Sequence, residues 1–214
     1  MGKTEYWHDI VTEKSWNILK GLTGKFDFIL IGGWAAYLWS RGLKSMDIDI
    51  IVDFSNLDKL KKEYDLRKND SLKKYEIKIE EIDIDIYIPY YSKLTIPAED
   101  ILKEKAENIE GFSVISKEML LLLKQGAEQE RGMSEKGEKD RFDIFGLLLY
   151  CDINYKKYYQ LLNKYGKESY FGRLISLIKN FREYKYFEMT PRQFRLKKEE
   201  ILKKLKSESG SIKV

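Results

Sequence analysis

The pattern of apolar and polar residues in the first quarter of the chain predicts a strand, a turn and a helix. Residues 26–31 form an almost wholly apolar run of strand length that ends at Gly32 and Gly33. Apolar and small residues then continue through residues 34–41, which is too long for another strand and favours a helix. Gly42 follows and suits the left-handed position just past a helix end.

Carboxylates and branched aliphatic residues alternate in residues 47–53. A period of two is the period of a strand, so Asp47 and Asp49 share one face, about 7 Å apart. Two like charges are costly there unless a cation lies between them, and oxygen ligands favour Mg²⁺ or Mn²⁺. The N–H groups of a helix beginning after Gly32 would attract the phosphates that often complete a Mg²⁺ shell. The alternative is a strand edge with solvated carboxylates.

Residues 75–91 predict a β-hairpin. Apolar residues occupy odd positions up to Ile79 and even positions from Ile82, so a turn or bulge is expected at residues 80–81. The second strand places Asp83 and Asp85 on a common face, opposite its isoleucines. A half-exposed strand without any ligand would show the same alternation.

The order strand, Gly32-Gly33, helix and Asp47-Ile48-Asp49 resembles the core motif of the DNA polymerase β-type nucleotidyltransferase superfamily. The resemblance implies Mg²⁺-dependent (or Mn²⁺-dependent) transfer of a nucleoside monophosphate from a nucleoside triphosphate to a hydroxyl group. It assigns Asp47 and Asp49 to the metal ions and the glycine pair to the phosphates. Many members carry Ser where this chain has Gly33.

The same resemblance implies a third metal-binding carboxylate on a neighbouring strand. Asp83 and Asp85 have the right parity, and Asp85 is preferred because it lies further from the turn. With Asp47 and Asp49, Asp85 would form the catalytic and metal-binding set. Ser45, which lies in the spacer before Asp47, is also predicted to bind the nucleotide.

A second resemblance lies in residues 124–150, which follow a strongly apolar helix predicted over 117–131 with Ser116 as its N-cap. These residues resemble the C-terminal motif of the AbiEii-like, abortive-infection or toxin-type nucleotidyltransferases, in which a lysine and an arginine precede Lys-Asp-x-x-Asp. The resemblance implies that these side chains bind or orient the triphosphate, and an interhelical salt-bridge network without a ligand is the alternative. The matching residues are Lys124, Arg131, Lys139, Asp140 and Asp143.

Three further helices are predicted over residues 155–165, 170–186 and 190–206, the last beginning with a capping box at Thr190. We therefore predict an α+β fold: a nucleotidyltransferase-like core with a mixed β-sheet flanked by helices, followed by a helical region. The predicted parts are a catalytic core over 1–115, a helical domain over 116–206 and a disordered basic tail over 207–214.

Composition excludes several classes of chemistry. The single cysteine, Cys151, allows no internal disulfide and no cysteine zinc site. The single histidine, His8, removes most zinc enzymes and any histidine-based triad as candidates. No long apolar run or cleavable leader is evident, so we expect a soluble, cytoplasmic protein with no membrane partner.

The basic residues are concentrated at the C-terminal end. Residues 191–214 contain 8 Lys or Arg and 3 Glu, a net charge of +5, so the rest of the chain has −1 of the total of +4. A basic end among Tyr and Phe residues favours RNA or another polyanion, although a solvated helix face explains the same residues. The expected acceptor is the 3′ end of RNA or tRNA, or else a protein or small-molecule hydroxyl.

Two other functions are compatible with the same sequence. The protein could be a catalytically silent nucleotide- or RNA-binding protein, or the toxin half of a pair with an antitoxin-like protein.

Overall fold

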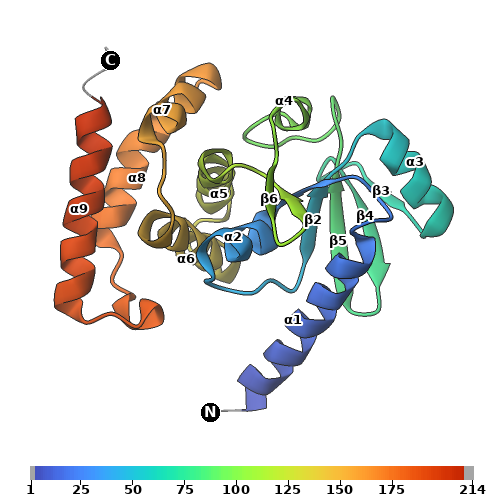
Figure 1. The fold of residues 1–214 in the computed structure, drawn as a ribbon, viewed down its shortest axis with the longest axis horizontal. Helices are drawn as coiled ribbons and strands as arrows, with labels where there is room; N and C mark the ends of the chain where they lie inside the picture. The colour runs from blue at the N-terminus through green and yellow to red at the C-terminus, as the bar shows by residue number, and fades with distance from the viewer. Residues whose placement is uncertain (1–2, 210–214) are drawn as a thin grey trace. The chain divides into compact units, whose positions relative to one another are not determined.

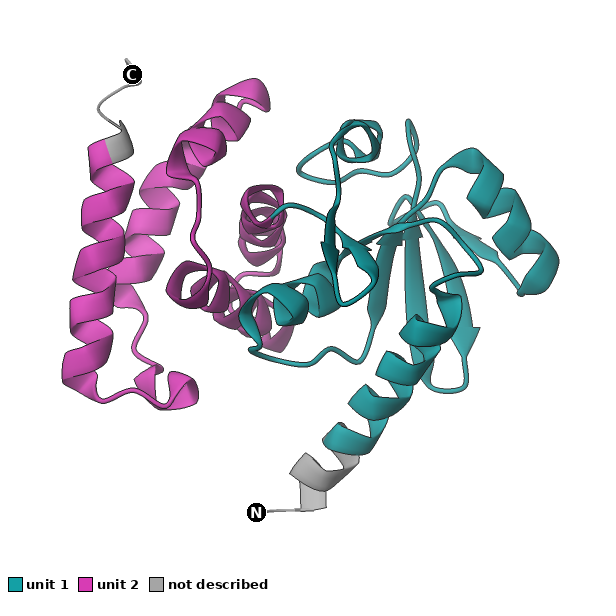
Figure 2. Ribbon diagram, viewed as in Figure 1, with its two compact units in different colours: residues 1–116 teal, residues 117–214 magenta. Residues whose placement is uncertain are grey.

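The computed structural model describes residues 3–209, and the chain divides into two compact units, Met1–Ser116 and Lys117–Val214 (Figure 2). We call them unit 1 and unit 2. Unit 1 contains the sheet, and the regular secondary structure in the described residues of unit 2 is all helical. A mixed sheet with helices followed by a helical region is the predicted α+β class, which the structure confirms.

Unit 1 is built on one sheet with the strand order β3-β4-β5-β2-β1-β7-β6 (Figure 1). The pairs β1/β7 and β2/β5 are parallel and the other pairs are antiparallel, so the sheet is mixed. The strands are β1 (Ile29–Ile31), β2 (Ile48–Ile51), β3 (Arg67–Asn69), β4 (Lys74–Ile79), β5 (Ile82–Tyr87), β6 (Glu107–Ile109) and β7 (Phe112–Val114).

Helices α1 (Lys3–Leu22) and α2 (Gly32–Ser40) pack together in unit 1. The rings of Trp16 and Trp34 lie 4.9 Å apart, and Trp34 Nε1 donates a buried hydrogen bond to Ser15 Oγ at 2.8 Å. The aliphatic residues at even positions of β2 and β5 are buried, among them Ile50 and Ile84. The carboxylates at odd positions therefore project from the opposite face of the sheet. Unit 1 also contains α3 (Phe54–Glu63) and α4 (Ala98–Lys103).

Unit 2 encloses a core of its own, rich in aromatic rings. Phe145 stacks on Phe181 with ring centroids 4.1 Å apart, and Phe187 stacks on Phe194 at 6.0 Å. The elements are α5 (Lys117–Arg131), α6 (Glu135–Tyr150), α7 (Tyr155–Lys164), α8 (Ser169–Asn180), the 3₁₀-helix η1 (Tyr184–Phe187) and α9 (Pro191–Ser209).

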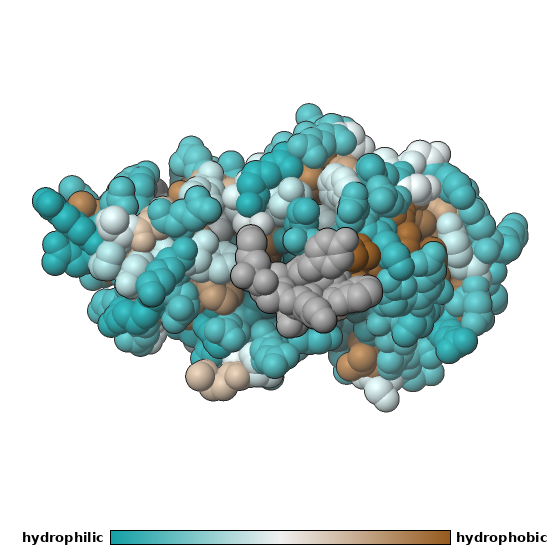
Figure 3. All heavy atoms as spheres, turned by 90° about the horizontal axis from the view of Figure 1, so that it is seen from below, coloured by the Kyte–Doolittle hydropathy of each residue, from teal (hydrophilic) through white to brown (hydrophobic). Residues whose placement is uncertain are grey.

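Within residues 3–209, no helix combines the length and the apolar character needed to cross a bilayer. Hydrophilic side chains cover most of the face shown in Figure 3.

One local prediction for unit 1 is wrong, and several of its features were not predicted. The left-handed residue that ends α2 is Arg41, with φ 56°, and not Gly42, because the helix stops one residue earlier than predicted. Asp53 caps α3, accepting a hydrogen bond from Asn56 N at 2.8 Å, and this cap was not predicted from the sequence. The edge strand β3, the helix α4 and the strand β6 were not predicted.

Unit 2 also differs from the prediction in detail. Helix α6 begins at Glu135, with Ser134 as its N-cap, and this helix start was not predicted. Helix α5 has the predicted bounds, but the Ser116 hydroxyl is buried without a hydrogen-bond partner in the described structure, so it makes no capping bond. The predicted helix over 170–186 is α8 followed by η1, and α9 continues through Ser209 into the predicted tail. The remainder of that tail, 210–214, lies outside the described residues.

Candidate functional site

Asp49 and Asp85 lie side by side in the middle of the sheet of unit 1. They are register partners on the parallel strands β2 and β5, and neighbouring strands are about 4.8 Å apart. Both side chains are partly exposed, unlike the buried isoleucines before and after them. The alternation noted in each strand thus places two carboxylates together on one face.

The Asp49 carboxylate also lies against Gly32, the first residue of α2. Gly32 has φ +67°, and a Cβ atom built on it would lie 2.0 Å from Asp49 Oδ2. This close approach leaves no room for any side chain at position 32, which explains the glycine. The N-cap residue of α2, Ile31, makes no capping hydrogen bond through its side chain. The first-turn N–H groups of this nine-residue helix have no partner within the helix and can donate to an anion.

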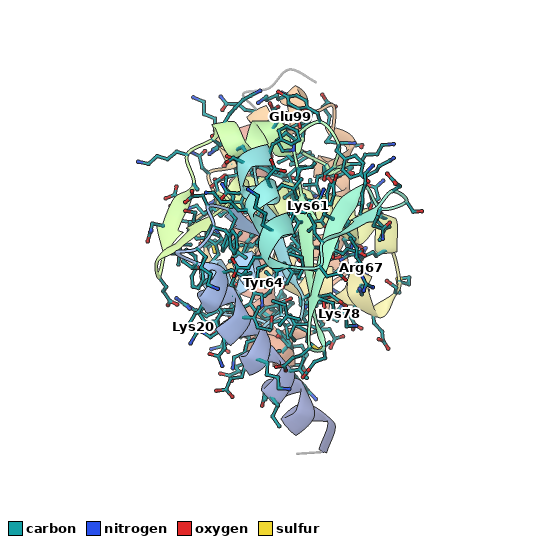
Figure 4. All side chains as sticks on the ribbon, turned by 90° about the vertical axis from the view of Figure 1, so that its right-hand side faces the viewer. Lys20, Lys61, Tyr64, Arg67, Lys78 and Glu99 are labelled. Atoms are coloured by element: carbon teal, nitrogen blue, oxygen red, sulfur yellow. The ribbon has the colours of Figure 1, made fainter. Side chains whose placement is uncertain are left out.

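The carboxylate of Asp85 is held by a lysine that the sequence did not single out. Lys74 Nζ lies 2.6 Å from Asp85 Oδ2 and 3.0 Å from an oxygen of Glu76. Glu76 is the register partner of Asp85 on β4, so three carboxylates lie in a row across β4, β5 and β2. Arg67 on β3 is the register partner of Glu76, and its exposed side chain is labelled in Figure 4.

The pKa of Asp85 is raised to about 6, mainly by burial and next by the negative charge of Asp49, while Lys74 acts in the opposite direction. Asp83 has a different environment: its side chain is 56% exposed and faces Lys78 across the hairpin at 3.7 Å. Of the two candidates for the third carboxylate, Asp85 is therefore the one that shares a site with Asp49.

The other predicted residues of unit 1 lie around this pair. Asp47 precedes β2 by one residue and is partly exposed, Ser45 is buried, and Gly33 lies buried in the first turn of α2. Within residues 3–209, no three His, Cys, Asp or Glu side chains are grouped as a metal site. The assignment of Asp47, Asp49 and Asp85 to a metal therefore stays a prediction.

The chemistry of the site nevertheless fits a divalent cation. All its candidate ligands are carboxylate oxygens, which Mg²⁺ and Mn²⁺ prefer. The charge of Asp49 disfavours ionisation of Asp85, and a bound cation would offset that repulsion. At present Lys74 supplies the positive charge next to Asp85.

The second predicted group forms a buried ionic network in unit 2. Lys124 Nζ lies 3.1 Å from Asp140 Oδ1 and 2.7 Å from Asp143 Oδ2, and Arg131 Nη1 lies 2.8 Å from Asp140 Oδ2. Burial raises the pKa of Asp143, and the charges of Lys124 and Lys139 oppose that rise. The structure thus joins Lys124, Arg131, Asp140 and Asp143 in a salt-bridge network, and Lys139 acts on Asp143 through its charge.

Arg131 differs from Lys124 in its exposure. The Lys124 side chain is almost wholly buried between two carboxylates, whereas about half of the Arg131 side chain, 46%, is exposed. Nucleotide binding by Lys124, Arg131, Lys139 and Asp140 stays a prediction, and Arg131 is the residue of this ion-paired group best able to reach a ligand.

Sequence reasoning missed Lys74, Glu76 and Tyr87. Tyr87 donates a hydrogen bond from its hydroxyl to Asp49 Oδ1 at 3.4 Å. A signal for Glu76 was present, because a hairpin that turns at residues 80–81 pairs position 76 with position 85. Lys74 follows from the same alternation, since it shares the face of Glu76.

No protein-family model matches the sequence, and no curated protein sequence matches it. Among solved structures, the chain is similar to JHP933 of Helicobacter pylori, at 17% identity and a TM-score of 0.46, over 99% of this chain and 97% of that one. It is also similar to an antigenic nucleotidyltransferase-like protein of Paracoccidioides brasiliensis, at 19% identity and a TM-score of 0.37, over 65% and 74% of the two chains.

A third similar structure is the Megavirus polyadenylate synthase, at 16% identity and a TM-score of 0.44. The match covers 70% of this chain and 32% of the viral protein, so the chain spans about a third of that protein's length.

Proposed function

We propose that this chain is a metal-dependent nucleotidyltransferase that moves a nucleoside monophosphate from a nucleoside triphosphate to a hydroxyl group. The observation that best supports the proposal is the position of Asp49, which adjoins Asp85 on one side and Gly32 on the other. Carboxylates for a cation and helix N–H groups for a phosphate therefore occur at one place. Nucleotidyl transfer requires these two kinds of group together.

Each residue has a defined part in this proposal. Asp47, Asp49 and Asp85 hold the divalent ions, and Gly32 and Gly33 present backbone N–H groups to the phosphates. A bound Mg²⁺ would stabilise negative charge on the phosphoryl oxygens and lower the pKa of the acceptor hydroxyl.

The proposed reaction forms one bond and breaks one. The acceptor oxygen bonds to the α-phosphorus, the bond from that phosphorus to the oxygen bridging to the β-phosphate breaks, and pyrophosphate leaves with the bonding electrons. Asp85 accepts the proton of the attacking hydroxyl. Lys74 keeps the Asp85 carboxylate aligned for this role, since its ammonium group already lies 2.6 Å from it.

RNA is the acceptor that the charge distribution favours, through its 3′ hydroxyl. Helix α9 exposes several cations, including Arg192, Arg195 and Lys203, and a polyanion is the partner that such a surface attracts. Protein and small-molecule hydroxyls remain the other acceptors, and an antitoxin-like partner stays a prediction.

The test is incubation of the purified protein with Mg²⁺ or Mn²⁺, total RNA and each α-labelled nucleoside triphosphate in turn. RNA, protein and small-molecule products are then separated. The fraction that gains label identifies the class of acceptor. Asp85→Asn should lower label transfer by about 100-fold or more, as expected for loss of a metal ligand and proton acceptor. The matched control, Asp83→Asn on the same strand, should stay within about twofold of wild type because that side chain projects to solvent.

Three results would contradict the proposal: transfer unaffected by EDTA, unchanged transfer in Asp85→Asn, or equal losses in Asp85→Asn and Asp83→Asn. If no label moves although calorimetry shows metal-dependent nucleotide binding, the chain is a silent nucleotide-binding protein and not a transferase.

A further inference from the structure

A cationic cavity lies in unit 2, where the end of α8, the turn that follows it and α9 meet. Its volume is ≈ 480 Å³, within the range of pockets that hold small ligands. Lys179, Arg182, Arg195 and Lys198 line it, and Glu199 is the one acid among the described residues of its wall. Four cations against one carboxylate give the cavity a net charge of +3.

Two of these cations converge on the same backbone atoms. Lys198 Nζ donates hydrogen bonds to the carbonyl oxygens of Lys179 and Phe181, each at 3.0 Å. Arg182 Nη1 donates to the same two carbonyl oxygens, at 2.6 and 3.3 Å. Lys198 is also buried, at 9% exposure. These side chains are thus held in place before any ligand arrives.

Stabilisation of the C-terminal end of α8 would account for one of these two cations, but not for both. A positive charge at a helix C-terminus is favourable, but a second one close to it adds repulsion. The pKa of Lys198 is lowered, mainly by burial and next by the charge of Arg182. An anion in the cavity would offset this repulsion, whereas in the present structure Glu199 lies near Arg195, 3.8 Å from its Nε.

Aromatic rings form much of the remaining wall, together with Pro191 and Leu202. Phe181 and Phe194 are buried, and the Lys198 ammonium group lies 5.5 Å from the centre of the Phe194 ring. Tyr184 lines the same cavity and is partly exposed. Inorganic phosphate would need only the cations, whereas a nucleotide uses cations for its phosphate and a ring surface for its base.

We propose that this cavity binds one nucleotide of a single-stranded RNA, with its phosphate on Arg182 and Arg195 and its base on Tyr184. The cavity itself recognises the nucleotide unit, and the choice of RNA over DNA rests on the proposed function. If the chain is a nucleotidyltransferase, the bound strand is its acceptor. If it is not, the cavity still binds one nucleotide unit of a single-stranded nucleic acid.

The test is fluorescence anisotropy of a labelled single-stranded RNA of mixed sequence, titrated with the full chain. Arg182→Gln combined with Arg195→Gln should weaken binding by about tenfold or more. The same change should reduce the dependence of log K on log salt by about 0.7, the value expected for the one phosphate that is no longer neutralised. The matched control is Lys136→Gln combined with Lys156→Gln, which removes the same charge from exposed positions of α6 and α7 outside the cavity. Its affinity should fall by less than about threefold.

The base-stacking part has its own pair of variants. Tyr184→Ala should weaken binding by about fivefold or more, and Tyr184→Phe should bind like wild type because it keeps the ring. Circular dichroism and thermal melting of every variant show whether its fold is intact. A variant that has lost its fold is replaced by Lys179→Gln, which removes a cation from the cavity at an exposed position.

The following outcomes would overturn the proposal. Absence of RNA binding by the wild type, or equal losses in the cavity variant and its control, would leave no role for the cavity. Displacement of the RNA by equal concentrations of AMP or inorganic phosphate would make the ligand a free nucleotide or a simple anion. Equal affinity for single-stranded DNA would overturn the choice of RNA.

Asp49→Asn separates this inference from the proposed function. It should abolish label transfer and still bind RNA with wild-type affinity, because Asp49 belongs to unit 1 and the cavity is formed by unit 2.

Discussion

Gly32 shows how much of the candidate site depends on one residue. Its φ of +67° is a conformation in which side chains are strained, and Asp49 occupies the space where its Cβ would lie. The sequence could predict a glycine turn here from the end of the apolar run. It could not show the contact with Asp49, because that contact forms only when β1 and β2 pair.

We predict that Gly32→Ala destabilises the protein more than Gly24→Ala does. Gly24 also has a positive φ, +89°, but nothing lies within 4 Å of the position of its Cβ. Gly24→Ala should therefore cost about 1 kcal/mol from backbone strain alone. Gly32→Ala should cost about 3 kcal/mol, since overpacking against Asp49 adds to the strain. Denaturant unfolding of the two variants measures the difference, and equal costs would show that Asp49 yields without penalty.

Cys151 is predicted to react slowly in the folded protein. Burial raises the pKa of its thiol to about 11 from the ordinary value of 9.0. Only the thiolate reacts with iodoacetamide, so alkylation at pH 8 should be about 100-fold slower in the native state than in denaturant. Because the chain has a single cysteine, the mass change reports this one site. Equal rates in the two states would contradict the prediction.

At the scale of the elements, the sequence correctly predicted those features that depend only on the local pattern of apolar and polar residues. The hairpin of β4 and β5 could be placed because a change of apolar parity requires a turn, and Glu80 is indeed left-handed there, with φ 54°. The edge strand β3 was missed because Arg67, Lys68 and Asn69 are all polar. These residues form a strand because they pair with β4, and not because of their own sequence pattern.

The cap of α3 gives a prediction with a defined pH dependence. Asp53 accepts hydrogen bonds from Asn56 and Ser55, and the backbone hydrogen bond from Asn56 is the first cause of its lowered pKa. Asp53→Ala should lower the free energy of unfolding by about 1 kcal/mol at pH 7, the usual value of an N-cap. A carboxyl with a lowered native pKa stabilises the fold above its unfolded pKa of about 3.9 and loses that contribution as the pH falls through the native pKa.

The difference between wild type and Asp53→Ala should therefore be constant from pH 7 to about pH 5 and shrink below about pH 4. Asp53→Asn is the control, because an amide oxygen can cap a helix without titrating. It should keep most of the stability at pH 7. A wild-type advantage over Asp53→Ala that grows on acidification would rule out this account of the cap.

At the scale of the whole molecule, the sequence predicted the class of fold but not all of its connections. Alternation in two separate segments placed Asp49 and Asp85 on polar faces, and the parallel pairing of β2 with β5 makes them neighbours. That pairing joins segments more than thirty residues apart, so no local pattern determines it. The ionic network of unit 2 was predicted as a set of residues by resemblance, but the burial of Asp140 and Asp143 is a property of the packed helices.

Each unit has its own buried core, and this leads to a final prediction about how the molecule unfolds. Asp140 lies between Lys124 and Arg131 inside unit 2, and its side chain is almost wholly buried. Asp140→Ala leaves a buried lysine with one carboxylate fewer and should destabilise unit 2 by about 3 kcal/mol. Glu200→Ala, which removes surface ion pairs with Lys197 and Lys204, should cost less than about 1 kcal/mol.

Hydrogen exchange followed by mass spectrometry would locate the effect of Asp140→Ala. Amides of α5 and α6 should exchange faster, while those of β2 and β5 keep their protection, because the mutated network is contained in unit 2. An equal loss of protection in β2 and β5 would mean that the two units unfold as one. In that case the two units would have one common free energy of unfolding. No variant could then destabilise the acidic pair of unit 1 without also destabilising the cationic cavity of unit 2.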